Sequence, residues 1–311
     1  MRPIFPGLFL LSLSLLTNCS RQVAATALAY PGGKSKALIL SYDDGVIEDI
    51  PFAHLLEDHG LVGTFNLNSG YLGVTRGWPQ PGGDTVFQQY IPVDSVRSVY
   101  KNHEIAAHGT FHQDFLALTE AEIREEIGSD IANLERLAGH RIESMAYPFG
   151  RSDATVATIV GTTGLTNART VADTHTFALP DSLFLWHPTC HDSRAPELTD
   201  AYLALPNDTL SLFYVWGHAW EFKDPARWLA IQDFCRKMGH QTTIWSVGSG
   251  AYVTYLAALH KVRRTPNRLH NPASNPPVWV RLANGQYERL APGASRRARM
   301  GSDSQRMLKN E

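Results

Sequence analysis

Residues 37–45 read ALILSYDDG, an apolar run that ends in two aspartates and a glycine. Three further short apolar runs also end in polar clusters: residues 104–107 before His108, residues 144–146 before Tyr147, and residues 212–215 before Trp216. A barrel of parallel strands presents its functional groups at the carboxyl ends of the strands. The four runs therefore predict an α/β fold in which the four polar clusters lie together.

Helical patterns lie between these runs. Residues 119–122 form a capping box, and apolar residues recur at helical spacing until Gly139, at Ile123, Ile127, Ile131, Leu134 and Leu137. A second helix is expected at residues 51–59, followed by an apolar strand at 61–67. The alternation of strand and helix favours an α/β architecture over a sandwich or a helical bundle.

The overall composition excludes one class of partner. The chain has 311 residues, of which 43% are hydrophobic and 19% are charged, which is enough for one large domain. Its formal net charge of -2 gives no electrostatic basis for nucleic-acid binding, so we expect no nucleic-acid partner and a neutral substrate instead.

The N-terminal segment indicates export. Residues 4–16 are apolar after Arg2 but too short to span a bilayer comfortably, and Cys19 follows at the position of a lipid-modified cysteine. Asn18 departs from the small residue usual before such a cysteine, so cleavage within residues 24–29 is an alternative. We expect residues 1–29 to be an export segment and linker. The protein would then be periplasmic or membrane-anchored and extracellular, touching the membrane only through a lipid at Cys19.

Two cysteines remain in the expected folded body, Cys190 and Cys235. They could pair in an oxidising compartment or remain as two buried thiols, and the sequence leaves both alternatives open.

Residues 70–92 are rich in Gly, Pro and aromatic residues and have no helical or alternating period, so we expect a long loop. At a barrel mouth its Trp78 could stack on sugar rings, or the segment could be a structural insertion. Trp186, Trp216 and Trp220 have stronger claims to the site because they lie beside histidines.

The composition changes again near the C-terminus. Residues 278–282 and 287–290 predict a β-hairpin that turns near Asn284 and Gly285. We expect a main domain at residues 30–261, a small β appendage at 262–294, and a disordered basic tail at 295–311.

Two of the polar clusters suit a metal. Consecutive side chains leave a strand on opposite sides, so one of Asp43 and Asp44 can bind a metal while the other faces a different partner. His108 and His112, four positions apart, can share one face. A carboxylate and two imidazoles leave a position for water, which is the catalytic form of a zinc-type site.

These motifs together resemble the polysaccharide deacetylases of the NodB-homology class, carbohydrate esterase family 4. Residues 41–45, Ser-Tyr-Asp-Asp-Gly, match the first motif of the family, and the pair His108 and His112 matches its metal-binding histidines. Residues 148–150, Pro-Phe-Gly, match a later motif, and His218 matches the late histidine. The resemblance spans residues 37–259, with the motifs in the family's order.

The resemblance implies a distorted (β/α) barrel of about seven strands and the hydrolysis of N- or O-acetyl groups of a polysaccharide. Asp44, His108 and His112 would hold a divalent metal, zinc first, with cobalt or nickel as alternatives. Asp43 would be the general base and His218 the general acid. The metal and a backbone N–H near Tyr147 would stabilise the oxyanion. Pro148, Trp216 and Arg169 complete the expected substrate-side residues.

The chain also departs from the family pattern. Gly109 stands where the family usually has Ser or Thr. The family usually also has an arginine a few positions before the proline that matches Pro148, where it steadies the catalytic aspartate, and residues 143–147 contain none. Arg151 or Arg169 could substitute for it. His187 and His191 are assigned to the substrate side or to a structural role. The missing arginine and the extra C-terminal β segment motivate an alternative hypothesis, in which the chain is a weak or inactive surface carbohydrate-binding protein of the same fold.

Overall fold

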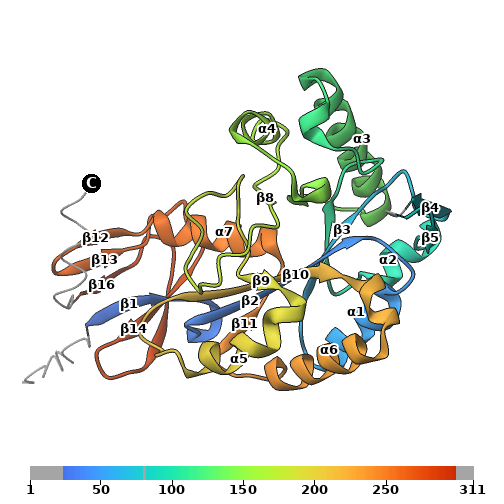
Figure 1. Cartoon of the computed structure of the whole chain (residues 1–311). Helices are drawn as coiled ribbons and strands as arrows, with labels where there is room; N and C mark the ends of the chain where they lie inside the picture. The colour runs from blue at the N-terminus through green and yellow to red at the C-terminus, as the bar shows by residue number, and fades with distance from the viewer. Residues whose placement is uncertain (1–23, 80–81, 299–311) are drawn as a thin grey trace, which may run out of the picture.

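One curled, parallel sheet forms the centre of the computed structural model, which describes residues 24–79 and 82–298 (Figure 1). Seven strands follow the order β8-β7-β6-β3-β2-β10-β9, and β11 pairs with the start of β2. The strands are β2 (Lys36–Asp44), β3 (Gly63–Leu67), β6 (Glu104–Ala107), β7 (Ser144–Ala146), β8 (Asn167–Arg169), β9 (Cys190–His191), β10 (Ser211–His218) and β11 (Ile244–Ser246). The sheet forms the distorted barrel that the sequence predicted.

Helices cover the outside of the sheet, as parallel strands require. They are α1 (Asp49–Asp58), α2 (Val96–Val99), α3 (Glu120–Ala138), α4 (Ala154–Val160), α5 (Ala195–Ala204), α6 (Pro225–Met238) and α7 (Ser249–His260). Short 3₁₀ turns are η1 (Pro31–Gly33), η2 (Val93–Ser95), η3 (Phe115–Ala117), η4 (Pro148–Gly150), η5 (Asp192–Arg194) and η6 (Ala219–Lys223). The capping box at Thr119 and the left-handed Gly139 confirm the predicted ends of α3.

The core explains why the strand sequences are continuously apolar. All nine residues of β2 are buried, because β2 has neighbours on both edges and helices outside. One large apolar cluster spans the sheet and its helices, and includes Leu38, Leu40, Phe52 and Phe65. The sheet is therefore a rigid base for the groups at its carboxyl end.

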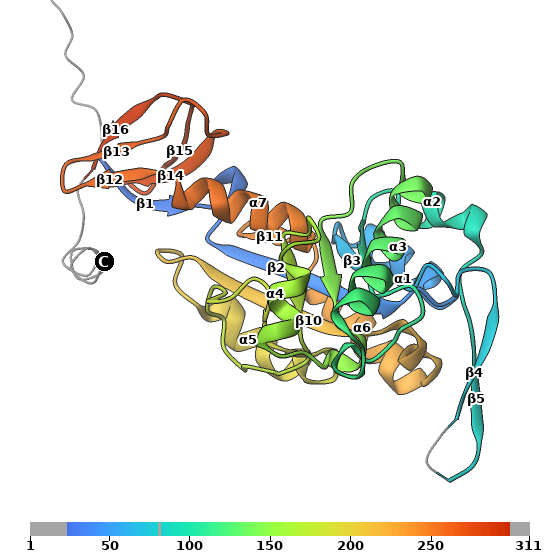
Figure 2. The same cartoon turned by 90° about the horizontal axis from the view of Figure 1, so that it is seen from above.

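A small β structure lies at the other end of the molecule (Figure 2). One sheet has the order β1-β14-β15, with β1 at Ala25–Ala29, β14 at Val278–Leu282 and β15 at Tyr287–Leu290. The predicted hairpin at 278–290 is confirmed. The other sheet has the order β12-β13-β16, with β12 at Arg263–Thr265, β13 at Arg268–His270 and β16 at Ser295–Arg297.

Two segments of this β structure differ from our expectation. Residues 25–29, expected in the export segment and linker, form β1, because their backbone pairs with β14 and the small Ala25 packs in the appendage core. Residues 295–297, expected in the disordered tail, form β16, because they pair with β13 while Ala298 is buried beside Leu269. Small alanines and charged arginines give little strand signal in the sequence.

Residues 70–92 were also expected to lack regular structure, and this prediction is wrong. They contain the antiparallel pair β4 (Thr75–Pro79) and β5 (Thr85–Gln89). The Gly and Pro content masked the strand-forming Trp78, Val86 and Phe87, which lie on the paired segments. Figure 2 shows this hairpin projecting from the end of the molecule opposite the appendage.

Cys190 and Cys235 are buried free thiols, so the disulfide alternative does not hold. Cys19 and the predicted apolar export segment lie outside the described residues. Among the residues that the structure describes, no helix has the length and hydropathy needed to cross a membrane.

Candidate metal and catalytic site

The strand register brings the predicted site residues together. In the parallel sheet, His218 at the end of β10 lies opposite Asp43 on β2, and Asp43 lies opposite Asn66 on β3. His108 directly follows β6, the next strand along the sheet. Residues separated by more than a hundred positions therefore meet because their strands end at one level.

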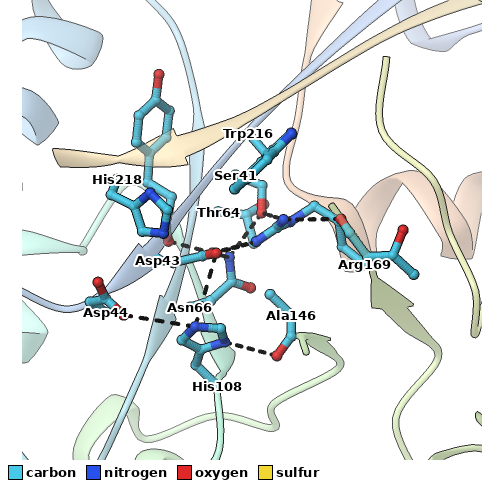
Figure 3. Close-up of polar contacts among 12 residues, drawn as sticks. Ser41, Asp43, Asp44, Thr64, Asn66, His108, Ala146, Arg169, Trp216 and His218 are labelled. Carbon is cyan, nitrogen blue, oxygen red and sulfur yellow. Dashed lines mark hydrogen bonds and ion pairs between the residues drawn. The ribbon is translucent and has the colours of Figure 1, made fainter. Parts of the chain in front are cut away.

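Asp44, His108 and His112 form a candidate metal-binding group. The Nε2 atoms of His108 and His112 each lie 3.8 Å from Oδ1 of Asp44. Ligands on a tetrahedral ion with bonds of about 2.1 Å lie roughly 3.4 Å apart, which is close to these separations. His108 Nδ1 donates to the carbonyl oxygen of Ala146 at 2.8 Å, which leaves its Nε2 lone pair for a metal (Figure 3).

The electrostatics of the two imidazoles also suit metal binding. Burial lowers the pKa of His108. Burial, with a contribution from His108, lowers the pKa of His112 to about 4. Both rings are therefore neutral near pH 7, and only neutral imidazole binds a metal. The residues present fit a divalent ion.

Helix α3 fixes the backbone that carries the two histidines. Buried Asp130 accepts hydrogen bonds from the N–H of His108 and of Ser69, both at 2.9 Å. Glu126 accepts the N–H of Phe111, and Thr110 donates its hydroxyl to the Glu126 carbonyl. Gly109, where the family usually has Ser or Thr, has φ of 77°, a conformation that glycine adopts at little cost.

Asp43 faces a different partner, as the alternation of the strand end predicted. Both of its carboxylate oxygens accept from the guanidinium of Arg169, the contact to Oδ2 being 2.5 Å, and Oδ1 also accepts from Asn66 Nδ2 at 2.8 Å (Figure 3). Burial alone would raise the pKa of Asp43, but Arg169, with His108 and His218, holds it at about 2. Asp43 is thus an ionised carboxylate beside the candidate metal group, with its Oδ2 3.9 Å from His108 Nε2.

His218 is held by a carboxylate of its own. Its Nδ1 lies 3.0 Å from Oε1 of Glu221, which also lies 3.0 Å from His191 Nε2. Arg227 pairs with the other oxygen of Glu221 at 2.9 Å. Burial would lower the pKa of His218, but Glu221 and the two aspartates raise it to about 9. His218 is therefore protonated near neutral pH.

A cavity of about 550 Å³ opens over these groups. Its walls are largely apolar: Trp78, Pro79 and Val86 from the hairpin, Phe149 and Val171 from the loops after β7 and β8, and Trp216 and Trp220 around His218. Asp44, His112 and Phe149 all have positive φ, between 52° and 88°. Such backbone strain in non-glycine residues is concentrated at functional sites.

The predicted substrate-side residues have mixed outcomes. Trp216 lines the cavity, whereas Tyr147 and Pro148 do not. Tyr147 donates its backbone N–H to the Arg169 carbonyl and its hydroxyl to the Phe184 carbonyl, so its own N–H is not free for an oxyanion. Arg169 contacts Asp43 and does not line the cavity, and Arg151 pairs with Asp114 at the surface.

The structure also places three further residues that the sequence singled out, namely Trp186, His187 and His191. Trp186 packs in the core against Tyr214 and Tyr252 and does not line the cavity, so the prediction that it belongs to the site is wrong. Its neighbour His187 does not line the cavity either. His191 contacts Glu221, whereas His187 contacts the hydroxyl of Thr170 at 2.6 Å.

The sequence reasoning assigned no site role to Asn66 or Glu221. A signal existed for Asn66, which is a polar residue within the apolar run 61–67. Glu221 lies three residues after His218, a spacing that a turn can close. Only the structure shows that the turn η6 closes it.

Comparison with known proteins supports the family resemblance that these motifs predicted. Residues 30–168 match the model of the family Polysaccharide deacetylase, which confirms the resemblance that the motifs predicted. This range contains Asp43, Asp44, His108 and His112 and ends before Arg169 and His218. No curated protein matches the chain.

Solved structures that match the chain include a crystal structure of a putative polysaccharide deacetylase from Mycobacterium smegmatis, which has a similar fold. It is 17% identical, covers 78% of this chain and 98% of its own, and has a TM-score of 0.54. A family 4 carbohydrate esterase from Streptomyces lividans in complex with acetate is 15% identical, covers 68% and 92%, and has a TM-score of 0.43. A family 4 pseudoenzyme from Bacillus anthracis is 12% identical, covers 73% and 68%, and has a TM-score of 0.45.

Proposed function

We propose that the protein is an active metal-dependent hydrolase that removes acetyl groups from a polysaccharide. The observation that carries this proposal is the pairing of Asp43 with Arg169 directly beside the group Asp44, His108 and His112. The arrangement provides one carboxylate to bind a metal and a second, ionised carboxylate to accept a proton. Metal-assisted hydrolysis needs both.

Asp44, His108 and His112 would hold the ion, and we propose zinc, since one carboxylate and two imidazoles are its usual catalytic ligands. A bound divalent ion lowers the pKa of water and polarises the acetyl carbonyl. Asp43 accepts the proton of the attacking water. Arg169 and Asn66 keep the Asp43 carboxylate ionised and fixed in orientation.

His218 is the proposed acid. Its Nδ1 contacts Glu221, which leaves Nε2 to give a proton to the departing amine or alcohol. The oxyanion donor is reassigned within the predicted turn. Because the N–H of Tyr147 is used in the sheet, we assign the donor to Phe149, which lies in η4 and lines the cavity.

The substrate is a glycan whose ring faces contact the aromatic walls of Trp78, Trp216 and Trp220, with polymers of N-acetylglucosamine as the first candidate. The alternative of an inactive carbohydrate-binding protein was motivated by the missing motif arginine and by the extra C-terminal β segment. Arg169 supplies a guanidinium to Asp43 from another strand, which answers the first of these two reasons and favours an active enzyme. We further propose that the protein is exported, on the evidence of Arg2, the apolar residues 4–16 and Cys19.

The test is an acetate-release assay with chelator-treated protein reloaded with zinc, cobalt or nickel. The substrates are chitooligosaccharides, peptidoglycan and acetylxylan. We expect release from at least one substrate with one metal and none from the chelated protein. No release in any combination, from protein that binds the metal, would contradict the proposal.

A further inference from the structure

The outward face of the sheet β12-β13-β16 carries three arginines. On β13, Leu269 is buried in the appendage core, so its neighbours Arg268 and His270 point to the opposite face. Arg263 lies opposite His270, and Arg297 lies opposite Arg268. Directly opposed residues of antiparallel strands share a face. Arg263, Arg268 and Arg297, all exposed, therefore form one surface, called here the arginine face.

Nothing within the described part of the chain neutralises this face. Residues 261–298 hold eight lysines and arginines but a single acidic residue, Glu288, and Glu288 pairs with Arg296. None of the three arginines has an ion-pair partner among the described residues. Arg268 and Arg297 are moreover directly opposed, and like charges in that position destabilise a sheet. The whole chain is slightly acidic, so this concentration is local.

The position of the face suggests its partner. Strand β1 begins at Ala25 in the same appendage, and the chain before it leads within a few residues to Cys19 and the predicted export segment. The five backbone steps from Cys19 to Ala24 reach at most about 18 Å. The export segment therefore brings any membrane that it contacts close to the appendage.

The appendage and the cavity lie at opposite ends of the molecule. Strand β2 begins on the side of the appendage and ends in the site, at Asp43 and Asp44 (Figure 2). Its nine residues span about 30 Å, which separates the two ends. A membrane beneath the appendage would leave the cavity directed away from the lipid and open to a polymer.

We propose that the arginine face docks on an anionic lipid surface. Guanidinium groups bind phosphate in a planar, bidentate geometry, and each cationic side chain near an anionic bilayer contributes about fivefold to binding. Three of them contribute roughly 100-fold, provided that all three reach the surface together. The proposal does not depend on the enzymatic function.

The experiment measures binding of the full chain to two kinds of vesicle, phosphatidylcholine alone and phosphatidylcholine mixed with phosphatidylglycerol. The apolar segment 4–16 contributes to binding of both kinds of vesicle. The ratio of the two affinities therefore isolates the electrostatic contribution to binding. The test variant carries Arg263→Glu, Arg268→Glu and Arg297→Glu. A matched control carries the same charge change on exposed barrel residues, Arg97→Glu, Lys101→Glu and Arg136→Glu.

We expect the wild type and the control to prefer the anionic vesicles, and the test variant to lose roughly 100-fold or more of that preference, because the substitution removes three positive charges and adds three negative ones. The preference should also fall as salt is raised. Equal loss in the control, or an unchanged preference in the test variant, would overturn the proposal. So would retention by heparin without vesicle preference, which would mark the face as a site for a soluble polyanion. If the triple variant does not fold, the Arg→Gln variants provide the same comparison.

Discussion

Arg169, buried at the end of β8, contacts both carboxylate oxygens of Asp43 although 126 positions separate them in the sequence. The resemblance to the family predicted an arginine a few positions before Pro148, and residues 143–147 contain none. The guanidinium instead comes from the next strand, and Ser41 and the Thr170 carbonyl hold it in place. The same electrostatic support for an aspartate thus comes from a different position in the fold.

Replacing Arg169 by Met should strongly destabilise the protein. The change leaves the buried Asp43 carboxylate without its cation, and an uncompensated buried charge costs about 3–5 kcal/mol in the free energy of unfolding. The double variant Arg169→Met, Asp43→Asn should recover part of that loss. Arg151→Met is the matched control, because Arg151 pairs with Asp114 at the surface and should cost less than about 1 kcal/mol. Chemical denaturation measures all three, and equal losses for Arg169 and Arg151 would contradict the role of the buried pair.

The substitution Glu221→Gln should shift the pH dependence of catalysis. Glu221 raises the pKa of His218, to about 9 with the two aspartates, so its loss should move the alkaline limit of activity down by roughly 1 to 3 pH units. The same raised pKa means that protonated His218 stabilises the fold at pH values below its usual 6.5. That contribution disappears as pH rises through 9. Glu221→Asp should shift the profile less. An unchanged pH profile in Glu221→Gln would show that Glu221 does not tune His218.

The hairpin β4 to β5 should affect substrate binding more than turnover. Trp78→Ala removes an aromatic wall of the cavity, and we expect KM to rise about 3- to 10-fold with a smaller change in kcat. Phe87→Ala is the control, since Phe87 is 66% exposed on the same hairpin and does not line the cavity. Metal content should be measured in both variants, because Trp78 packs on His112. Equal effects of the two changes on KM would refute a specific role for Trp78.

The elements that carry a local signal could be predicted from the sequence. The four strand ends were visible because a buried parallel strand is a continuous apolar run, and α3 because its cap and its apolar spacing lie within twenty residues. The contact between Arg169 and Asp43 could only be suggested, since it depends on the order of strands in the sheet. The hairpin at 75–89 was missed because its Gly and Pro residues outweigh its strand formers. Strand β1 was missed because its alanines form a strand only by pairing with β14.

The central claim is that two neighbouring aspartates have different roles. Asp44 binds the metal, and Asp43 accepts the proton of the attacking water. Metal content and acetate release should be measured side by side in Asp43→Asn and Asp44→Asn. We expect Asp43→Asn to keep its metal and lose activity by roughly 100-fold or more, and Asp44→Asn to lose the metal itself. Loss of metal from Asp43→Asn, with metal retained in Asp44→Asn, would contradict the account and exchange the two roles.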